Sequence, residues 1–208
     1  MRILIFIKHH LTFLWSLAEW FNGLCFSVAY KNKVSETAEM VCEEYSNDVL
    51  SFRCVEQADI ANLADFFTAQ PEESYRYFKP HAFDEKTLHK LWKNSSFSQF
   101  IVKTSDNQIA GYFLIRFFVN KKAFVGFLVG DKFQGRGIAK QMCRIALKIC
   151  WENQFRTFAT VSKENTRALA TYRRINDFTV LKELSDNYIY IEYTRNGMKR
   201  EEDKCITS

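Results

Sequence analysis

The chain has 208 residues, of which 47% are apolar and 16% aromatic, and its formal net charge is +5. This length and composition suffice for one sizeable hydrophobic core with an appendage. The charges are spread along the sequence, which argues against a nucleic-acid-binding arm and fits a small anionic ligand better. The six cysteines include no CxxC pair and no His/Cys cluster at zinc spacing, so neither a metal site nor a disulfide framework is expected. Reduced thiols and a cytoplasmic location are the simplest interpretation.

The first thirty residues are strongly apolar and allow several interpretations. The segment 11–30 is about as long as a membrane span and has basic or polar flanks. A signal peptide would also fit, as would a start codon misassigned ahead of Met40. A narrow polar stripe favours an amphipathic helix on the protein surface or at a membrane interface instead. The stripe consists of Thr12, Ser16, Glu19, Gly23 and Ser27. We therefore expect residues 1–48 to form a helical extension, with contact to a membrane surface as one option.

From residue 50 the sequence alternates strand and helix patterns with short connections, which predicts an α/β fold with a mixed sheet and helices on its faces. Turn residues at 105–108 and 120–122 join three successive strands. Strands are expected at 50–55, 98–104, 108–119, 123–129, 156–161, 178–184 and 188–194. Helices are expected at 57–67, 84–94, 138–150 and 165–175. The charged residues 195–208 are predicted to form a tail.

The helix that begins at Ile138 has an apolar face and a polar face. The expected solvent face carries Lys140, Gln141, Arg144 and Lys148.

Two of the seven glycines, Gly135 and Gly137, lie directly before this helix. A glycine-rich turn that leads into a helix exposes backbone N–H groups at the positive end of the helix dipole, and such a turn binds phosphate. Glycine permits close approach of a ligand and positive φ angles. Lys132, Arg136 and Lys140 add positive charge. The spacing excludes GxGxxG and GxxxxGK[ST], and a tight turn without a ligand is the alternative.

The stretch "FLVGDKFQGRGIAKQM" resembles the acetyl-CoA-binding motif of the GNAT superfamily of N-acetyltransferases, which is Gln or Arg, two residues, Gly, one residue, then Gly or Ala. The matching residues are Gln134, Gly137 and Ala139.

A second stretch, "NTRALATY", is similar to another motif of the superfamily, in which Ala follows an Asn after three residues and Tyr follows after seven. Asn165, Ala168 and Tyr172 match it. The resemblance covers about residues 50–193 and implies a GNAT-like acyl-CoA N-acyltransferase fold, for which we set the domain at 49–194.

The resemblance implies that acetyl-CoA, with no metal, lies in a splay between the strand ending at Val129 and the one ending near Val161. A backbone N–H near Leu128 would stabilise the oxyanion, and Tyr172 would protonate the leaving thiolate. A core aromatic is the alternative for Tyr172, and a helix N-cap the alternative for Asn165. The residues implied in cofactor binding are Phe127, Leu128, Val129, Gln134, Gly135, Arg136, Gly137, Ile138, Ala139 and Asn165.

The family usually has Gly-Phe shortly after the tyrosine, whereas this chain has Asn176 and Asp177 where one glycine is expected. Because Asn tolerates the left-handed conformation, we expect the helix to end there.

The acceptor is the least defined part of the prediction. His81 and Phe78 lie in the region that commonly shapes the acceptor pocket of the superfamily, and His81 is a candidate general base, with a water chain as the alternative. The resemblance implies acetyl transfer to a primary amine of a small acceptor, with an amino sugar or sugar nucleotide as one candidate. A protein or peptide N-acetyltransferase and a catalytically silent acyl-CoA-binding module are the alternatives. A homodimer is one option for its assembly.

Overall fold

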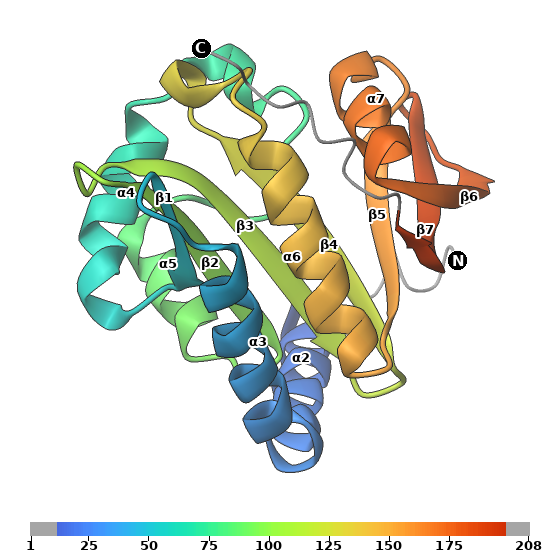
Figure 1. Cartoon of the computed structure of the whole chain (residues 1–208). Coiled ribbons are helices and arrows are strands. Elements are labelled where there is room, and N and C mark those ends of the chain that lie inside the picture. The colour runs from blue at the N-terminus through green and yellow to red at the C-terminus, as the bar shows by residue number, and fades with distance from the viewer. Residues whose placement is uncertain (1–11, 199–208) are drawn as a thin grey trace.

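Within residues 12–198, seven strands form one mixed sheet in the order β1-β2-β3-β4-β5-β7-β6 (Figure 1). The structure is a computed structural model that describes these residues, apart from the side chains of 12–16 and 196–198. Neighbouring strands are antiparallel except β4 and β5, which are parallel. The strands are β1 (Leu50–Cys54), β2 (Phe97–Thr104), β3 (Ile109–Phe118), β4 (Lys122–Val129), β5 (Arg156–Ser162), β6 (Asn176–Glu183) and β7 (Tyr188–Met198).

Helices cover both faces of this sheet, which confirms the predicted α/β class. The long strands β2, β3 and β4 follow one another as antiparallel neighbours, as the predicted turns require. Strand β7 continues to Met198, into the segment predicted as a tail, and residues 199–208 lie outside the described part of the chain. The helices are α2 (Thr12–Ala29), α3 (Lys31–Tyr45), α4 (Ile60–Thr68), α5 (Glu85–Trp92), α6 (Ile138–Glu152) and α7 (Thr166–Ile175).

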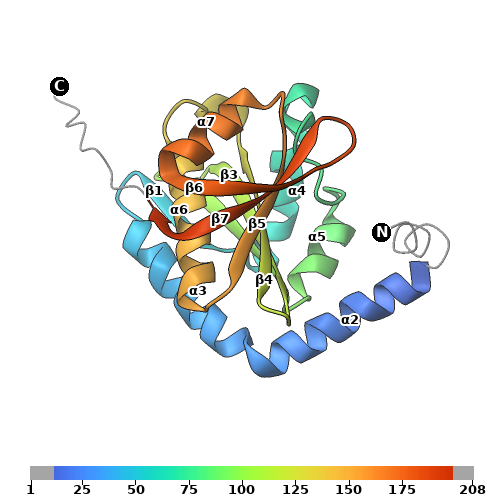
Figure 2. The same ribbon diagram turned by 90° about the vertical axis from the view of Figure 1, so that its right-hand side faces the viewer.

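Alternate residues of the sheet belong to two separate hydrophobic clusters, one on each face. In β3, Phe113 and Ile115 belong to the larger cluster, whereas Tyr112 and Leu114 belong to the smaller one. Successive side chains of a strand point to opposite faces, so this strand is apolar on both sides and needs cover on both. Helices α3, α6 and α7 pack on the first face, and α4 and α5 pack on the second (Figures 1 and 2).

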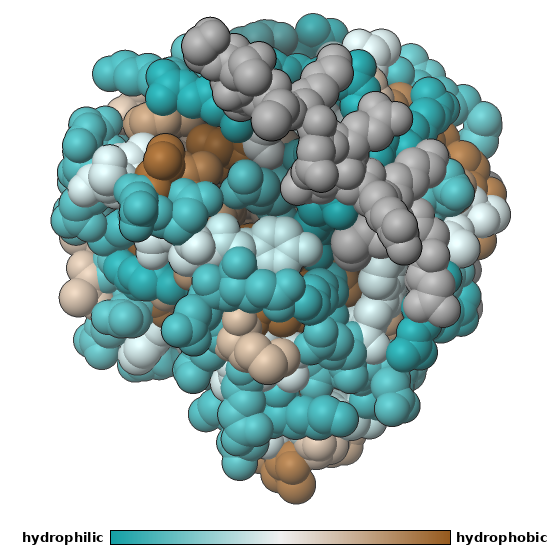
Figure 3. Space-filling view, viewed as in Figure 1, coloured by the Kyte–Doolittle hydropathy of each residue, from teal (hydrophilic) through white to brown (hydrophobic). Residues whose placement is uncertain are grey.

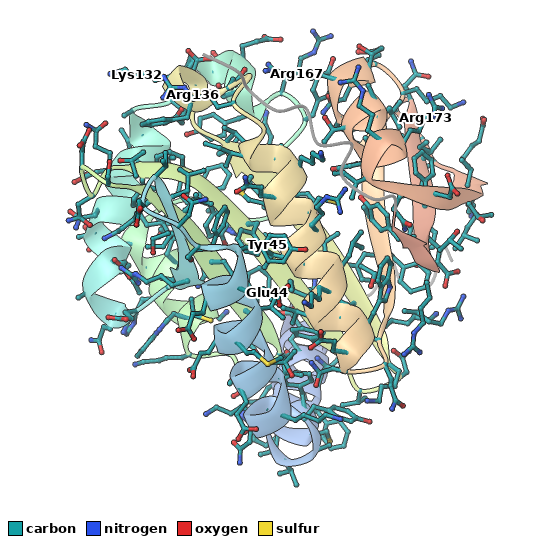
Figure 4. All side chains as sticks on the ribbon, viewed as in Figure 1. Glu44, Tyr45, Lys132, Arg136, Arg167 and Arg173 are labelled. Carbon is teal, nitrogen blue, oxygen red and sulfur yellow. The ribbon has the colours of Figure 1, made fainter. Side chains whose placement is uncertain are left out.

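The crossover between the two parallel strands is α6, whose apolar face is buried as expected. Its polar face differs from the prediction at Arg144, whose side chain is buried rather than exposed to solvent. Helix α3 packs along α6. At their contact Lys148 Nζ donates to Glu44 Oε1 at 2.7 Å, and Figure 4 shows Glu44 and Tyr45 against α6. Periodicity reports the polarity of each position but not the elements that pack over it.

Helix α7 ends at Ile175, as predicted, but not through the left-handed conformation that was expected at Asn176. Asn176 does not adopt the left-handed conformation: its φ is −154° and its ψ is 158°, so the chain passes directly from the helix into β6. Its side-chain amide donates to the carbonyl oxygen of Thr194 at 3.1 Å. The pairing of β6 with β7 shifts register between Asn176 and Phe178, which accommodates the additional residue as an irregularity in the strand.

Helix α2 contacts the body of the protein through the side that carries Asn22 and Phe26. The Asn22 amide donates to the carbonyl oxygen of Phe117 at 2.9 Å, and its oxygen accepts from the Val119 amide at 3.1 Å. Phe26 is buried and stacks on Phe117. Figure 2 shows α2 running away from the sheet along the lower edge of the molecule. In the part of the chain that the structure describes, no helix has the length and apolar character that crossing a membrane requires.

Helix α3 shares the larger cluster with the sheet and with α6. A boundary near residue 48 between an extension and a catalytic domain stays a prediction, although core contacts cross it. The α3 residues in the cluster are Val34, Ala38, Val41 and Cys42.

Candidate active site

Strands β4 and β5 pair only over their first residues and then separate. Residues 122–124 of β4 pair with residues 156–158 of β5, although β4 continues to Val129 and β5 to Ser162. A cavity of about 500 Å³ lies beside the unpaired ends and is lined from both strands. The opening that the family resemblance implies between these strand ends is therefore present, and it leaves backbone groups of β4 without a neighbouring strand.

The direction of these backbone groups follows from the pairing of β4 with β3. The Gly130 amide donates to the carbonyl oxygen of Ala110 at 2.9 Å, and the register along β4 is continuous. Successive residues of an antiparallel strand direct their backbone groups to opposite sides. The Leu128 amide therefore faces β3, whereas the amides of Phe127 and Val129 face the opening. The oxyanion contact near Leu128 stays a prediction, and with this geometry it would have to come from the amide of Phe127 or Val129. An extended ligand can pair with these amides as an added strand.

The glycine turn at the end of this opening has the backbone that the sequence predicts. Gly135 has φ +80° and Gly137 has φ +77°, both in the region that other residues rarely adopt. A Cβ on either glycine would meet nothing within 4 Å, so the turn borders open space. Gly137 is the N-cap of α6 and provides no side-chain cap, so the first amides of the helix are left for an external acceptor. This geometry suits a phosphate group.

Cationic side chains lie on both sides of the turn. Figure 4 shows Lys132 and Arg136 beside it and Arg167 on the side of α7. An Arg167 Nη1 hydrogen bond to Gln134 Oε1, at 2.5 Å, joins the start of α7 to the turn. Arg136 lies over the Phe133 ring, 5.4 Å from its centroid, and donates to the carbonyl oxygen of Lys132. Every residue predicted to bind the cofactor lines the cavity except Arg136.

Helix α7 supplies the opposite wall. The Asn165 side chain accepts from the Ala168 amide at 3.0 Å, so Asn165 is the N-cap of the helix and also lines the cavity. Tyr172 lies nearly two turns further on and lines the cavity as well. Its ring contacts those of Phe127, at 6.2 Å, and Tyr193, at 5.7 Å between centroids. The two motifs thus meet across the opening.

The hydroxyl of Tyr172 is held in its protonated form. Burial raises the pKa of this phenol well above its usual range, and the neighbouring Cys143 raises it further. The buried Tyr193 hydroxyl lies beside that of Tyr172, and this contact lowers the pKa of Tyr172 by less than burial raises it. A phenol that stays protonated can donate a proton but cannot serve as a base at neutral pH.

The aromatic segment before α5 closes one end of the cavity. Phe78 lines it together with Ser74 and Tyr77. A Cβ on Gly126 of β4 would lie only 3.1 Å from Phe78 Cε2, so glycine lets this ring lie directly on the strand. The acceptor was predicted to bind near this aromatic segment, and its position stays a prediction.

His81 lies outside the lining of the cavity. Its Nδ1 donates to the carbonyl oxygen of Ala82 at 2.8 Å, and its Nε2 is 3.0 Å from the hydroxyl of buried Tyr112. Its ring contacts Phe67 and Phe83 in the smaller cluster. Burial lowers the pKa of His81, which favours the neutral ring. These contacts favour a positioning role, and the general-base role stays a prediction.

Three loops that the sequence analysis did not connect meet beside the cavity. Arg76 Nη2 donates to Glu164 Oε2 at 3.1 Å, and the Asn187 amide donates to the other oxygen of Glu164 at 3.2 Å. The aromatic segment is thereby joined to the loop before α7 and to the turn between β6 and β7. These residues are far apart in the sequence, and no local pattern relates them.

The charged side chains that line the cavity are cationic. Among the described residues that line it there is no Asp or Glu, whereas Lys140, Arg167 and Arg174 do line it. The described residues also contain no group of three His, Cys, Asp or Glu side chains that could hold a metal ion.

Comparisons with solved structures find the same fold in several acetyltransferases. The ribosomal-protein-S5-alanine acetyltransferase from Vibrio fischeri has a TM-score of 0.61 at 16% identity, over 74% of this chain and 98% of that one. The GNAT domain of S. lividans PAT has a TM-score of 0.59 at 19% identity, over 69% and 89%. Spermidine N-acetyltransferase from Vibrio cholerae, in complex with CoA and spermine, has a TM-score of 0.53 at 17% identity, over 71% and 94%.

A comparison with curated proteins finds no match. The family model described as "Acetyltransferase (GNAT) family" matches residues 62–178, which is more than half of the chain and includes the glycine turn and the start of β6. Together with the shared fold, this match shows that the chain belongs to the acetyltransferase (GNAT) family.

Proposed function

We propose that the protein transfers an acetyl group from acetyl-CoA to a primary amine of a small acceptor. One observation carries the proposal: the opening between β4 and β5 leads from free backbone amides, past Tyr172, to a glycine turn at the start of a helix. An extended ligand with a phosphate end and a reactive end matches this arrangement.

The residues of the cavity fit acetyl-CoA, which supplies an activated thioester when bound. The amides from Gly135 to Ala139 would bind its pyrophosphate, and those of Phe127 and Val129 would hold the pantetheine arm and the thioester oxygen. Negative charge that develops on this oxygen would be stabilised by an amide that needs no reorientation. The neutral amine of the acceptor would attack the thioester carbon directly, and the bond from this carbon to sulfur would break, so no covalent enzyme intermediate is needed. The Tyr172 hydroxyl would donate its proton to the departing sulfur, and the proton that the attacking nitrogen loses would pass to water, from which Tyr172 regains one.

The lining of the cavity favours an acceptor that carries no additional positive charges. Spermidine bears several ammonium groups, and a site for it would gain from carboxylates, which the described lining does not contain. Tyr77 and Phe78 offer aromatic faces instead, on which a sugar ring can stack. An amino sugar or a similar small amine is therefore the acceptor class that we propose.

A screen of amines that follows the release of CoA thiol tests this proposal. The panel contains amino sugars, their nucleotide-linked forms, spermidine, and a peptide with an N-terminal alanine. We expect the highest kcat/KM with the amino sugars. Preference for spermidine or for the peptide would contradict the acceptor class, and binding of acetyl-CoA without transfer to any amine would favour a silent acyl-CoA-binding module.

Substitution of Gly137 tests the phosphate turn. The φ of +77° strongly disfavours a β-branched residue, so Gly137→Val should shift the turn and lower acetyl-CoA affinity at least about tenfold. Calorimetric titration measures the affinity, and thermal unfolding monitors the fold. Gly137→Asn is the matched variant, because Asn tolerates positive φ but places a side chain in the phosphate path. If both variants fold and bind normally, the turn has only a structural role.

A further inference from the structure

Helix α2 presents a continuous apolar stripe away from the protein. With 3.6 residues per turn, the side chains of the stripe fall within an arc of roughly 100°. The most exposed aromatic pair is Trp20, at 63% exposure, and Phe21, at 58%. Figure 3 shows apolar surface at the lower tip of the molecule, where Figure 1 places α2 and α3. The stripe consists of Leu17, Trp20, Phe21, Leu24 and Val28.

The opposite side of α2 is the one that packs on the protein, and much of it is polar. Glu19 forms an ion pair with Arg116, with a nitrogen–oxygen distance of 2.6 Å. Asn22 forms hydrogen bonds with the backbone at the end of β3. A Cβ on Gly23 would lie 2.9 Å from Asn94 Oδ1. A surface helix of a soluble protein usually buries its apolar face and exposes its polar face. Helix α2 buries one large apolar side chain, Phe26, but its other large apolar side chains within the described residues lie on the exposed side, where they can contact an apolar environment outside the protein.

The charges around the stripe indicate what kind of surface it contacts. Between Met1 and Ser35 the sequence contains one carboxylate, that of Glu19, which is already paired with Arg116. The exposed Lys31 and Lys33 directly follow α2. The sequence before the helix contributes Arg2 and Lys8. The charges nearest to the stripe in the sequence are thus cations on both sides, before the exposed Glu36 and Glu39 of α3. These cations complement the anionic head groups of a bilayer, whereas a second copy of the chain would bring the same cations together.

We propose that α2 binds the surface of an anionic lipid bilayer, with its stripe in the interfacial region and the catalytic cavity outside the membrane. Trp20 suits this position because its ring is apolar and its N–H is polar. Exposed lysines at the end of the helix reach the head groups. The proposal is independent of the acceptor and of the chemistry at Tyr172.

Flotation of the full chain with vesicles tests the proposal. Vesicles of phosphatidylcholine with phosphatidylglycerol are compared with vesicles of phosphatidylcholine alone, at low and high salt. The wild type should float with the anionic vesicles and less with the neutral ones, and salt should weaken binding. The double variant Trp20→Ser, Phe21→Ser should lose about a hundredfold in partition coefficient, because two large apolar side chains no longer leave water.

The matched control removes two exposed apolar side chains from another element. Val180 and Leu181 of β6 are 48% and 45% exposed, and Val180→Ser, Leu181→Ser should bind vesicles within about twofold of the wild type. A separate variant, Lys31→Glu with Lys33→Glu, leaves the stripe intact. It should reduce binding to anionic vesicles but not binding to neutral ones. It keeps the test valid if the stripe variant fails to fold.

Two outcomes would overturn the proposal. One is vesicle binding by the folded stripe variant that equals that of the wild type. The other is no binding of the wild type to anionic vesicles. If light scattering then also finds a dimer that the stripe variant abolishes, a second copy covers the stripe.

Discussion

Replacement of Tyr172 by Phe should lower turnover by about 10² to 10⁴ while leaving acetyl-CoA affinity unchanged. The substitution keeps the ring, and with it the contacts to Phe127 and Tyr193 that form the wall of the cavity. It removes only the hydroxyl, which burial holds in the protonated form. Release of CoA thiol measures turnover, and calorimetric titration measures affinity.

The pH profile separates proton donation from packing. A free thiol has a pKa of about 8.5, so above this value the thiolate leaves without a proton and the defect of the variant should shrink. At lower pH the defect should be largest. Tyr193→Phe is the matched control, because it removes a buried hydroxyl that contacts Tyr172 but does not itself line the cavity, and its turnover should stay near that of the wild type. Normal turnover of Tyr172→Phe at every pH would leave Tyr172 with a structural role.

Local patterns predicted most of the sheet and the positions of the motifs. The apolar run of β3 and the glycine turn before α6 depend on neighbours in sequence, and both lie where they were predicted. The opening between β4 and β5 was implied by the resemblance, because the two motifs belong to a family that uses it. The pairing of only three residues on each strand confirms the opening.

The remaining features depend on contacts between distant segments. Arg167 lies inside a quoted motif, yet its bond to Gln134 exists only because α7 begins beside the glycine turn. The burial of Arg144 depends on the elements that pack over α6. His81 points toward Tyr112 because it lies among residues of the smaller cluster. The polar stripe of α2 was visible in the sequence, but periodicity alone does not tell which face of a helix meets the protein.

A shortened chain that begins at Met40 should be unfolded or strongly destabilised. The deletion removes Phe26, Val34 and Ala38, which are buried in the larger cluster, and it exposes Phe117 under α2. Loss of one buried Phe costs about 3 to 5 kcal/mol, and the total stability of a domain is about 5 to 15 kcal/mol. The remaining turns of α3 are also too short to be helical by themselves. Thermal unfolding followed by circular dichroism measures the effect, and we expect a Tm at least about 10 to 20 °C lower.

Single substitutions in the full chain show whether lost packing causes this effect. Phe26→Ala should cost about 3 to 5 kcal/mol, because it leaves a cavity against Phe117 and Phe155. Val28→Ala on the same helix is the control, since Val28 is 85% exposed and its loss should change stability by less than about 0.5 kcal/mol. If the chain from Met40 instead folds, melts like the wild type and binds acetyl-CoA, residues 1–39 are separable from the catalytic domain. The core contacts of the deleted part of α3 would then contribute little to the stability of the fold, and the role of α2 would be confined to its exposed apolar stripe.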